Sequence, residues 1–432
     1  MAKPSGSAAS RFAEYVQRLG RVLSHADRLE PLRAYLTGLL LPGERKSVEP
    51  MAAKIDPRRV SSRHQSMHHF VASAPWDPQP LLAVARDYAL EQMERHAPVA
   101  AWIVDDTGIP KKGSHSVGVA RQYCGALGKQ DNCQVVVTVS AANSMMSIPC
   151  AYRLYLPEGW ADDRQRRQQA GIPKALRFAP KWQIALSALD GLIADELPPA
   201  PVVADAGYGV VTAFRDALTE RGLSYMVGIT TQTTLWPPGL EPLPPRKWRG
   251  QGRPATKLRR NTPRHRPIAV VKLAMALPAR SWRTIRWREG TRGIMRSRFA
   301  AVTVRAAHRD EQRSRPRAEE WLLIEWPKGE REPTKFWLST VPQEASLEDL
   351  VRLAMLRWRI ERDFEEMKGE LGLDHYEGRN WLGFHHHGVL CIAAYAFLAA
   401  ERARLSPPEA VAFLKPAALP RGFRPRGAAR AS

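Results

Sequence analysis

The chain has 432 residues, of which 44% are hydrophobic, so a wholly disordered protein is excluded and two or three domains with a sizeable core are possible. The 65 Lys and Arg residues outnumber the 43 Asp and Glu residues, which gives a formal net charge of +22. A charge of this size favours a polyanionic partner, with nucleic acid first and an anionic membrane surface second.

The cysteines and the apolar runs argue against several other classes of protein. The chain has four cysteines and no Cys-x-x-Cys pair, so we expect free thiols rather than a disulfide scaffold or a structural zinc site. The first residues lack the apolar core of a signal peptide, and the apolar run 388–400 is too short to span a bilayer. The sequence therefore predicts a cytoplasmic protein with no membrane partner.

The chain begins with a region that we predict to be helical, residues 1–95. Apolar residues recur at helical spacing within 12–22 and 32–40, and another helix is expected over 81–93.

Strands and helices then alternate over residues 96–235. A short apolar run, 99–104, ends in Asp105 and Asp106, and a second, 202–204, ends in Asp205. Both runs predict buried strands. The other predicted strands cover residues 116–123, 135–140, 148–156 and 224–229, and the predicted helices cover 182–197 and 211–221. This order predicts a mixed α/β sheet flanked by helices.

Prolines end that pattern, and residues 236–335 are predicted to form a β-rich insertion. The expected strands cover residues 270–277, 282–288, 299–305, 321–326 and 335–340. The segment 246–266 carries nine Lys or Arg residues and no acid. It either follows a DNA backbone or is a solvated loop.

Residues 336–405 are predicted to close the α/β region with two helices. The first starts at a capping box, Ser346 with Asp349, and ends at Gly372. The second is expected over 388–404. The basic tail, residues 406–432, is expected to be disordered.

Several acids occupy positions at which their carboxylates could bind a metal ion. Asp105 and Asp205 each follow a short predicted strand, and ligands of α/β sheets bind at the carboxyl ends of such strands. The two acids could therefore share a divalent cation. The alternative is that each acid only forms a turn. On the first closing helix, Arg357, Glu361 and Lys368 fall within about 40° of one another. Glu361 could then complete a metal site while the two cations hold phosphates. The alternative is an ordinary Arg–Glu pair on a solvated face.

Three segments together resemble the Asp, Asp and Glu regions of DDE transposases from bacterial insertion sequences. They are IVDDTG at 103–108, VVADAGYG at 202–209 and RWRIERDF at 357–364.

The last of these regions resembles one large branch of that family in particular. There it reads Tyr, two residues, Arg, three residues, Glu, six residues and Lys. Arg357, Glu361 and Lys368 keep this spacing, whereas Ala354 stands in place of the Tyr. The stretches 109–129, 153–160 and 371–379 strengthen the resemblance, which covers roughly residues 60–400.

The resemblance implies an RNase H-like catalytic core, with the β-rich insertion between the second Asp and the Glu. It also implies that Asp105, Asp205 and Glu361 hold Mg²⁺, for which Mn²⁺ can substitute. The family pattern of Asp, any residue, then Ser or Thr fits Asp105. Strand alternation points Asp106 the other way, so Asp105 is favoured and Asp106 stays a second candidate for the first catalytic acid.

The implied activity is cleavage at the ends of an insertion sequence and joining of the freed 3′-OH to target DNA. The implied partners are double-stranded DNA and a second copy of the chain on paired ends, in the cytoplasm of a bacterium at its nucleoid. The N-terminal helices are expected to read the terminal inverted repeats. The alternative is a non-enzymatic DNA-binding protein derived from a transposase. The residues expected to contact DNA are Arg357, Lys368, Arg253, Lys257, Arg259 and Arg260.

Two further patterns have a structural interpretation. His385, His386 and His387 are consecutive on a helix and cannot share one face, and Mg²⁺ avoids imidazole, so we do not expect a metal site there. Trp248, Trp282 and Trp287 could stack on a displaced base, but the core of the β-rich region is the favoured place for them.

Overall fold

The structure, a computed structural model, describes residues 6–260, 265–290 and 293–405. The predicted basic tail therefore lies outside the described residues. The described chain forms two compact units, one of residues 6–198 with 358–405 and one of residues 199–357. Both contain strands and helices, so the predicted mixed α/β architecture is confirmed.

The first unit begins with the helices predicted from apolar spacing. Amphipathic segments such as α1, with Tyr15, Val16 and Leu19 on its buried side, form because their apolar residues recur every three or four positions. These N-terminal helices are α1 (Ala8–Gly20), α2 (Leu29–Leu40), α3 (Val48–Ile55), α4 (Val60–Ala72) and α5 (Pro78–Met93).

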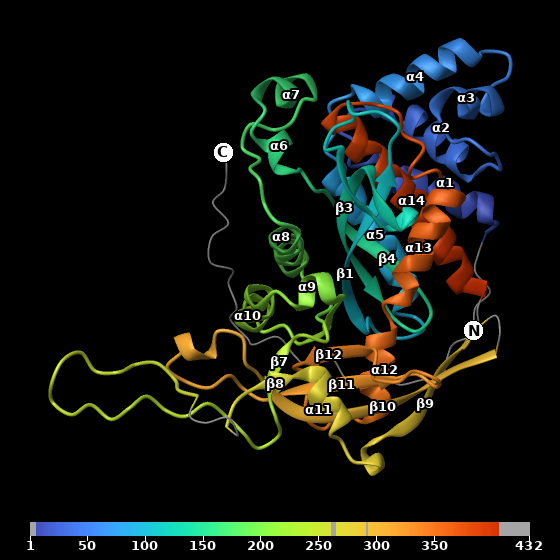
Figure 1. Cartoon of the computed structure of the whole chain (residues 1–432). Coiled ribbons are helices and arrows are strands. Elements are labelled where there is room, and N and C mark those ends of the chain that lie inside the picture. The colour runs from blue at the N-terminus through green and yellow to red at the C-terminus, as the bar shows by residue number, and fades with distance from the viewer. Residues whose placement is uncertain (1–5, 261–264, 291–292, 406–432) are drawn as a thin grey trace. The chain divides into compact units, whose positions relative to one another are not determined.

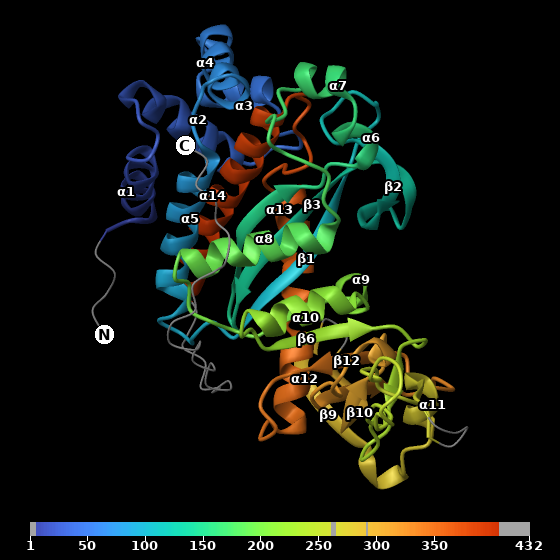
Figure 2. The same cartoon turned by 90° about the vertical axis from the view of Figure 1, so that its left-hand side faces the viewer.

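An antiparallel sheet forms the centre of this unit. Its long strand β3 pairs with each of the other three strands. Helix α8 lies on one face of the sheet, and α5 and α14 lie on the other (Figures 1 and 2). The strands are β1 (Ala101–Pro110), β2 (Ala120–Cys124), β3 (Lys129–Ala142) and β4 (Ser147–Leu154), and the remaining helices are α6 (Glu158–Ala161), α7 (Arg164–Gln169), α8 (Lys181–Ala194), α13 (Trp358–Gly369) and α14 (Trp381–Leu405).

Helix α14 runs through the core of the first unit and begins seven residues earlier than predicted. It packs against α2, α4, α5 and β4. Contrary to the expectation from the short apolar run, its length and composition would allow it to cross a membrane, but 89% of its most apolar window is buried inside the structure. A central core helix has the same properties.

The second unit contains a mixed sheet. Strand β5 pairs in parallel with β6, and the order β6–β12–β11–β10 continues with antiparallel pairs. Strand β10 also pairs with β9 and with β7, which pairs with β8. The strands are β5 (Val202–Ala204), β6 (Tyr225–Ile229), β7 (Thr234–Trp236), β8 (Ile268–Ala269), β9 (Arg283–Gly290), β10 (Gly293–Ala306), β11 (Glu320–Trp326) and β12 (Lys335–Ser339). The helices are α9 (Ala206–Gly209), α10 (Thr212–Glu220), α11 (Val270–Met275) and α12 (Leu347–Met355).

Two predicted elements differ from the structure in kind rather than in their bounds. Residues 270–277 were expected to form a strand, but they contain helix α11, which buries Val270, Leu273 and Ala274. The spacing of these three residues is helical, and a short apolar run does not distinguish the two structures. The single closing helix is also wrong, because Leu356 and Arg357 separate α12 from α13. The chain passes there from the second unit to the first, so each helix packs in its own core.

Candidate active site

Asp105 and Asp106 lie in the middle of a strand, not at its end as predicted. Strand β1 continues to Pro110 because antiparallel pairing with β3 extends along its whole length. Asp105 is paired with Thr138, whose hydroxyl donates to the Asp105 backbone carbonyl at 3.2 Å. Asp105 and Asp106 are therefore held by a rigid sheet rather than by a turn.

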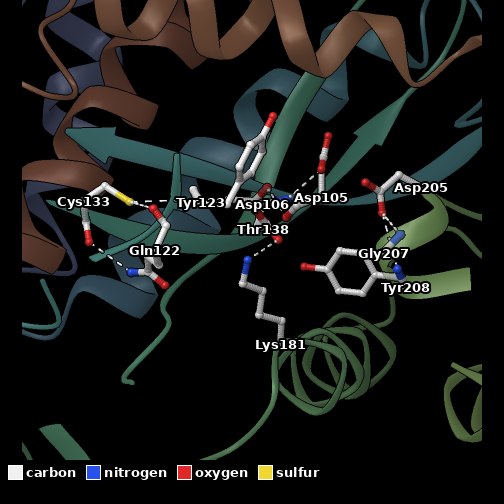
Figure 3. Close-up of polar contacts among 10 residues, drawn as sticks. All are labelled: Asp105, Asp106, Gln122, Tyr123, Cys133, Thr138, Lys181, Asp205, Gly207 and Tyr208. Carbon is white, nitrogen blue, oxygen red and sulfur yellow. Dashed lines mark hydrogen bonds and ion pairs between the residues drawn. The ribbon is translucent and has the colours of Figure 1, made fainter. Parts of the chain in front are cut away.

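The two carboxylates point to opposite faces of β1. Asp106 accepts a hydrogen bond from the Lys181 amino group of α8 at 2.9 Å, whereas Asp105 points away from Lys181 (Figure 3). The Asp105 carboxylate accepts from the Asp106 backbone N–H at 2.8 Å. The sequence did not predict a role for Lys181, because nothing in its local pattern indicates a partner 75 residues away.

Thr107 lies on the same face of β1 as Asp105, since side chains alternate along a strand. Its hydroxyl accepts from the Lys368 amino group at 2.7 Å, and the Gly108 carbonyl accepts from the same group at 2.8 Å. Lys368 belongs to α13, the helix that also carries Glu361. Burial lowers the pKa of this lysine. Lys368 therefore fastens the Glu361 helix to β1, two residues beyond Asp105.

A second anchor holds α13 through Asp363. This carboxylate is 5% exposed and accepts hydrogen bonds from the Ser147 hydroxyl of β4 at 2.5 Å and the Tyr395 hydroxyl of α14 at 2.7 Å. Burial raises its pKa to about 7. Asp363 was not predicted as a functional residue, although its position as an acid within the apolar stripe of Ile360 and Phe364 was a usable signal.

Glu361 lies in the first turn of α13 and is exposed. Arg357 lies in the turn that precedes that helix, so Arg357, Glu361 and Lys368 do not belong to one continuous helix as predicted. Glu361 and Lys368 do share one helix, two turns apart.

Asp205 is at the carboxyl end of β5, a parallel strand, as predicted. It is the N-cap of α9, and its Oδ1 accepts from the backbone N–H groups of Gly207 at 2.9 Å and Tyr208 at 3.4 Å (Figure 3). Tyr208 is buried, which fixes α9 on the sheet. The cap therefore fixes the orientation of the Asp205 carboxylate.

Gly209 brings α9 against β6. A Cβ at this position would lie 1.9 Å from the Gly228 carbonyl oxygen. We expect Gly209→Ala to lower the free energy of unfolding by about 1–3 kcal/mol, because α9 must shift to relieve the overlap. Urea unfolding measures this. As a control, Gly191→Ala in α8 has open space around its Cβ and should be neutral or stabilising. Equal stability of the two variants would contradict the close packing of α9.

The acids have the ligand chemistry of a hard cation. Asp105, Asp205 and Glu361 each keep part of the side chain accessible and offer only carboxylate oxygens, which hard divalent cations prefer. Within each unit taken by itself, the described residues gather no group of three His, Cys, Asp or Glu side chains that could hold a metal ion. Asp105 and Glu361 belong to the first unit and Asp205 to the second.

The basic side chains of segment 246–266 differ in their contacts. Arg259 donates to the Pro244 carbonyl at 2.9 Å, and Arg260 forms an ion pair with Asp310 at 2.7 Å, so both are engaged within the second unit. Arg253 and Lys257 are exposed. Residues 261–264 of the segment lie outside the described residues.

The three consecutive histidines are core residues. Burial lowers the pKa of each to about 4. Each hydrogen-bonds to a backbone carbonyl: His385 to Trp381 at 2.9 Å, His386 to Trp76 at 2.8 Å and His387 to Gly372 at 2.9 Å.

The core positions predicted for the tryptophans are wrong for Trp248, which is 57% exposed, whereas Trp282 and Trp287 are half-buried and contact other rings. Trp282 packs edge-on against Trp326, with 5.1 Å between ring centroids, and Trp287 packs against Phe299, with 5.5 Å between centroids.

Comparison with known proteins identifies a family and proteins similar to this chain. Residues 18–294 match the family described as DDE superfamily endonuclease, a range that includes Asp105, Asp106 and Asp205 and ends before Glu361. The chain is 30% identical over 228 residues to the probable transposase for insertion sequence element IS701 of Microchaete diplosiphon. That alignment covers 52% of this chain and 56% of the relative, so the chain spans about half of the relative's length.

A solved structure is also similar, but at a level that does not establish a shared fold. The piggyBac transposase synaptic complex with hairpin DNA, determined by cryo-EM, has a TM-score of 0.42 and 9% sequence identity to this chain. The superposition covers 88% of this chain and 66% of that one.

Proposed function

The chain belongs to the DDE superfamily of endonucleases, and from this premise we propose that it is the transposase of a bacterial insertion sequence. It would cleave phosphodiester bonds at the ends of that element and join the freed 3′-OH to target DNA. The observation that carries the proposal is the hydrogen bond from Lys368 to Thr107. It fastens the helix that bears Glu361 to the face of β1 that bears Asp105.

We propose that Asp105, Asp205 and Glu361 are the catalytic acids of an RNase H-like core. Their carboxylates would hold Mg²⁺, or Mn²⁺ in its place. Two bound divalent cations supply an activated hydroxide and neutralise charge at the scissile phosphate. The cap of α9 orients Asp205, and the anchors at Lys368 and Asp363 hold Glu361 in place.

The net charge of +22 supports double-stranded DNA as the substrate. Arg357 and the exposed Arg253 and Lys257 are proposed to contact its phosphates. Arg259 and Arg260, which have partners within their own unit, would support the loop that presents them. Two copies of the chain are proposed to act together on paired element ends.

Cleavage of a DNA fragment that carries the element's own ends tests this function. With Mg²⁺, the wild-type chain should nick the fragment at the element ends, and a fragment with scrambled ends should stay intact. Glu361→Ala should bind the DNA without cleaving it, because Glu361 is exposed and its loss removes a metal ligand rather than a core contact.

Three outcomes would contradict the proposal in different ways. Binding without cleavage by the wild-type chain in both Mg²⁺ and Mn²⁺ would favour a DNA-binding protein derived from a transposase. Cleavage that ignores the end sequence would indicate a general nuclease. Undiminished cleavage by Glu361→Ala would remove that residue from the site.

A further inference from the structure

The hairpin of β9 and β10 in the second unit has two chemically different faces. Helix α12 packs against one face, where Phe299 is buried and Arg283 forms an ion pair with Glu348 of that helix at 2.5 Å. Ile285 and Ser297, paired with each other, are also buried on this face. The opposite face therefore points away from α12.

That opposite face carries arginines in direct register. Arg286 of β9 is paired with Arg296 of β10, and the next pair on the same face is Thr284 with Arg298. All four residues are exposed. Arg296 and Arg298 are two positions apart, so their side chains emerge about 7 Å from each other along the strand. The face thus presents three closely spaced cations and no acid among these four positions.

The pairing of Arg286 with Arg296 is unfavourable for the hairpin alone. Like charges directly opposite each other in a sheet destabilise it, by up to about 1 kcal/mol. Among the residues that the structure describes, neither arginine has an ion-pair partner. A sequence that serves only the stability of the hairpin would place an opposite charge or a β-branched residue at one of these positions.

Arg298 adds an aromatic support to the same face. Its guanidinium lies 4.6 Å from the ring centroid of Trp326, the residue paired with it on β11. Trp326 is itself braced by Trp282. This stacking holds the Arg298 guanidinium on the sheet surface while leaving its edge available for hydrogen bonds to oxygen.

We propose that this arginine face, formed by Thr284, Arg286, Arg296 and Arg298, binds the phosphate backbone of duplex DNA. Duplex DNA carries one negative charge per about 1.7 Å of its axis, so the three guanidinium groups would meet several phosphates at once. Arginine forms bidentate hydrogen bonds to phosphate, and the bound phosphates would remove the repulsion between Arg286 and Arg296. The inference rests on the proposed function for the choice of DNA as the partner.

The sharpest test uses Arg286→Glu, which turns the like-charge pair into an ion pair. Its melting temperature should equal or exceed that of the wild-type chain, whereas its affinity for duplex DNA should fall. We expect the affinity for duplex DNA at 0.1 M salt to fall at least about tenfold. The reason is that each phosphate contact raises the binding constant by about 0.9 of a decade when salt is lowered from 1 M to 0.1 M. The slope of log affinity against log salt should become shallower by about one unit or more.

A second variant and a control separate this effect from net charge and from misfolding. Arg286→Thr with Arg296→Thr keeps strand-forming residues and should make the salt slope shallower by about two units. Arg315→Ala, an exposed arginine in the loop between β10 and β11, should change the slope by less than one unit.

The outcomes distinguish this inference from the proposed function. If the wild-type chain cleaves element ends but the hairpin variants bind DNA with the wild-type slope, the inference is overturned and the function stands. If the wild-type chain binds DNA without cleaving it and the variants bind more weakly, the inference stands without the function. A change in the sedimenting mass of the variants, with unchanged DNA affinity, would make this face a protein interface and overturn the inference.

Discussion

Asp105→Asn is expected to abolish cleavage of element ends while Asp106→Asn retains most of it. The two residues are adjacent, yet they lie on opposite faces of β1. Asp105 shares its face with Thr107, which is bonded to the Glu361 helix, whereas Asp106 faces Lys181 of α8. Loss of a metal-binding carboxylate should slow cleavage by about 10²- to 10⁴-fold, the equivalent of several kcal/mol of transition-state stabilisation.

The Asp106 variant should lose the ion pair with Lys181. The side chains of Lys181 and Asp106 are 36% and 30% exposed, so water screens the interaction and its loss costs up to about 1 kcal/mol of stability. Single-turnover cleavage by both variants, with DNA affinity and urea unfolding measured alongside, gives the comparison. A larger cleavage defect in Asp106→Asn than in Asp105→Asn would reverse the assignment of the two acids.

The parts of this site that the sequence predicted depend on local signals. Asp205 follows a short apolar run, which predicted the end of strand β5, whereas the short helix α9 that Asp205 caps was not predicted. The resemblance of the chain to DDE transposases of insertion sequences is confirmed by the family match, which includes the two Asp segments, and by the similarity to the IS701 transposase. Local spacing was sufficient there, because strand ends and helix caps are determined by neighbouring residues.

The parts that the sequence did not predict depend on distant partners. Pairing with β3 extends β1 beyond Asp105 and Asp106, and no local signal marks that extension. The interruption of the closing helix at residues 356–357 follows from the boundary between two units, although its apolar stripe continues through that point. Lys368 was expected to hold phosphate on the basis of spacing alone, but 261 residues separate it from its hydrogen-bond partner Thr107.

The buried histidines in the core of the first unit should make the protein lose stability in mild acid. His385, His386 and His387 are buried with their pKa lowered to about 4, whereas a histidine in the unfolded chain has a pKa of about 6.5. Between these values the unfolded chain binds more protons than the folded chain. The free energy of unfolding therefore falls as the pH falls from about 6.5 to about 4, by about 1.4 kcal/mol per pH unit for each histidine.

Two buried acids partly offset this loss. Burial raises the pKa of Asp363 to about 7 and also raises that of Glu320, so protonation of each stabilises the folded chain as the pH falls. The contribution of one histidine to the pH dependence of stability is therefore best measured by comparing the wild-type chain with a histidine variant, because both chains keep the two acids.

His385→Phe provides that difference. The ring of His385 packs against Trp381, with 4.3 Å between centroids, and against Phe384, so a phenyl ring retains the aromatic contacts. Urea unfolding between pH 4.5 and 7.5 should show a slope for the variant that is shallower than wild type by about 1.4 kcal/mol per pH unit below pH 6.5. At pH 7.5 the two chains should differ by only about 1 kcal/mol, the worth of the lost hydrogen bond to the Trp381 carbonyl. Parallel pH profiles would show that His385 takes up its proton in the folded core, and the buried histidines would then not be the source of acid sensitivity.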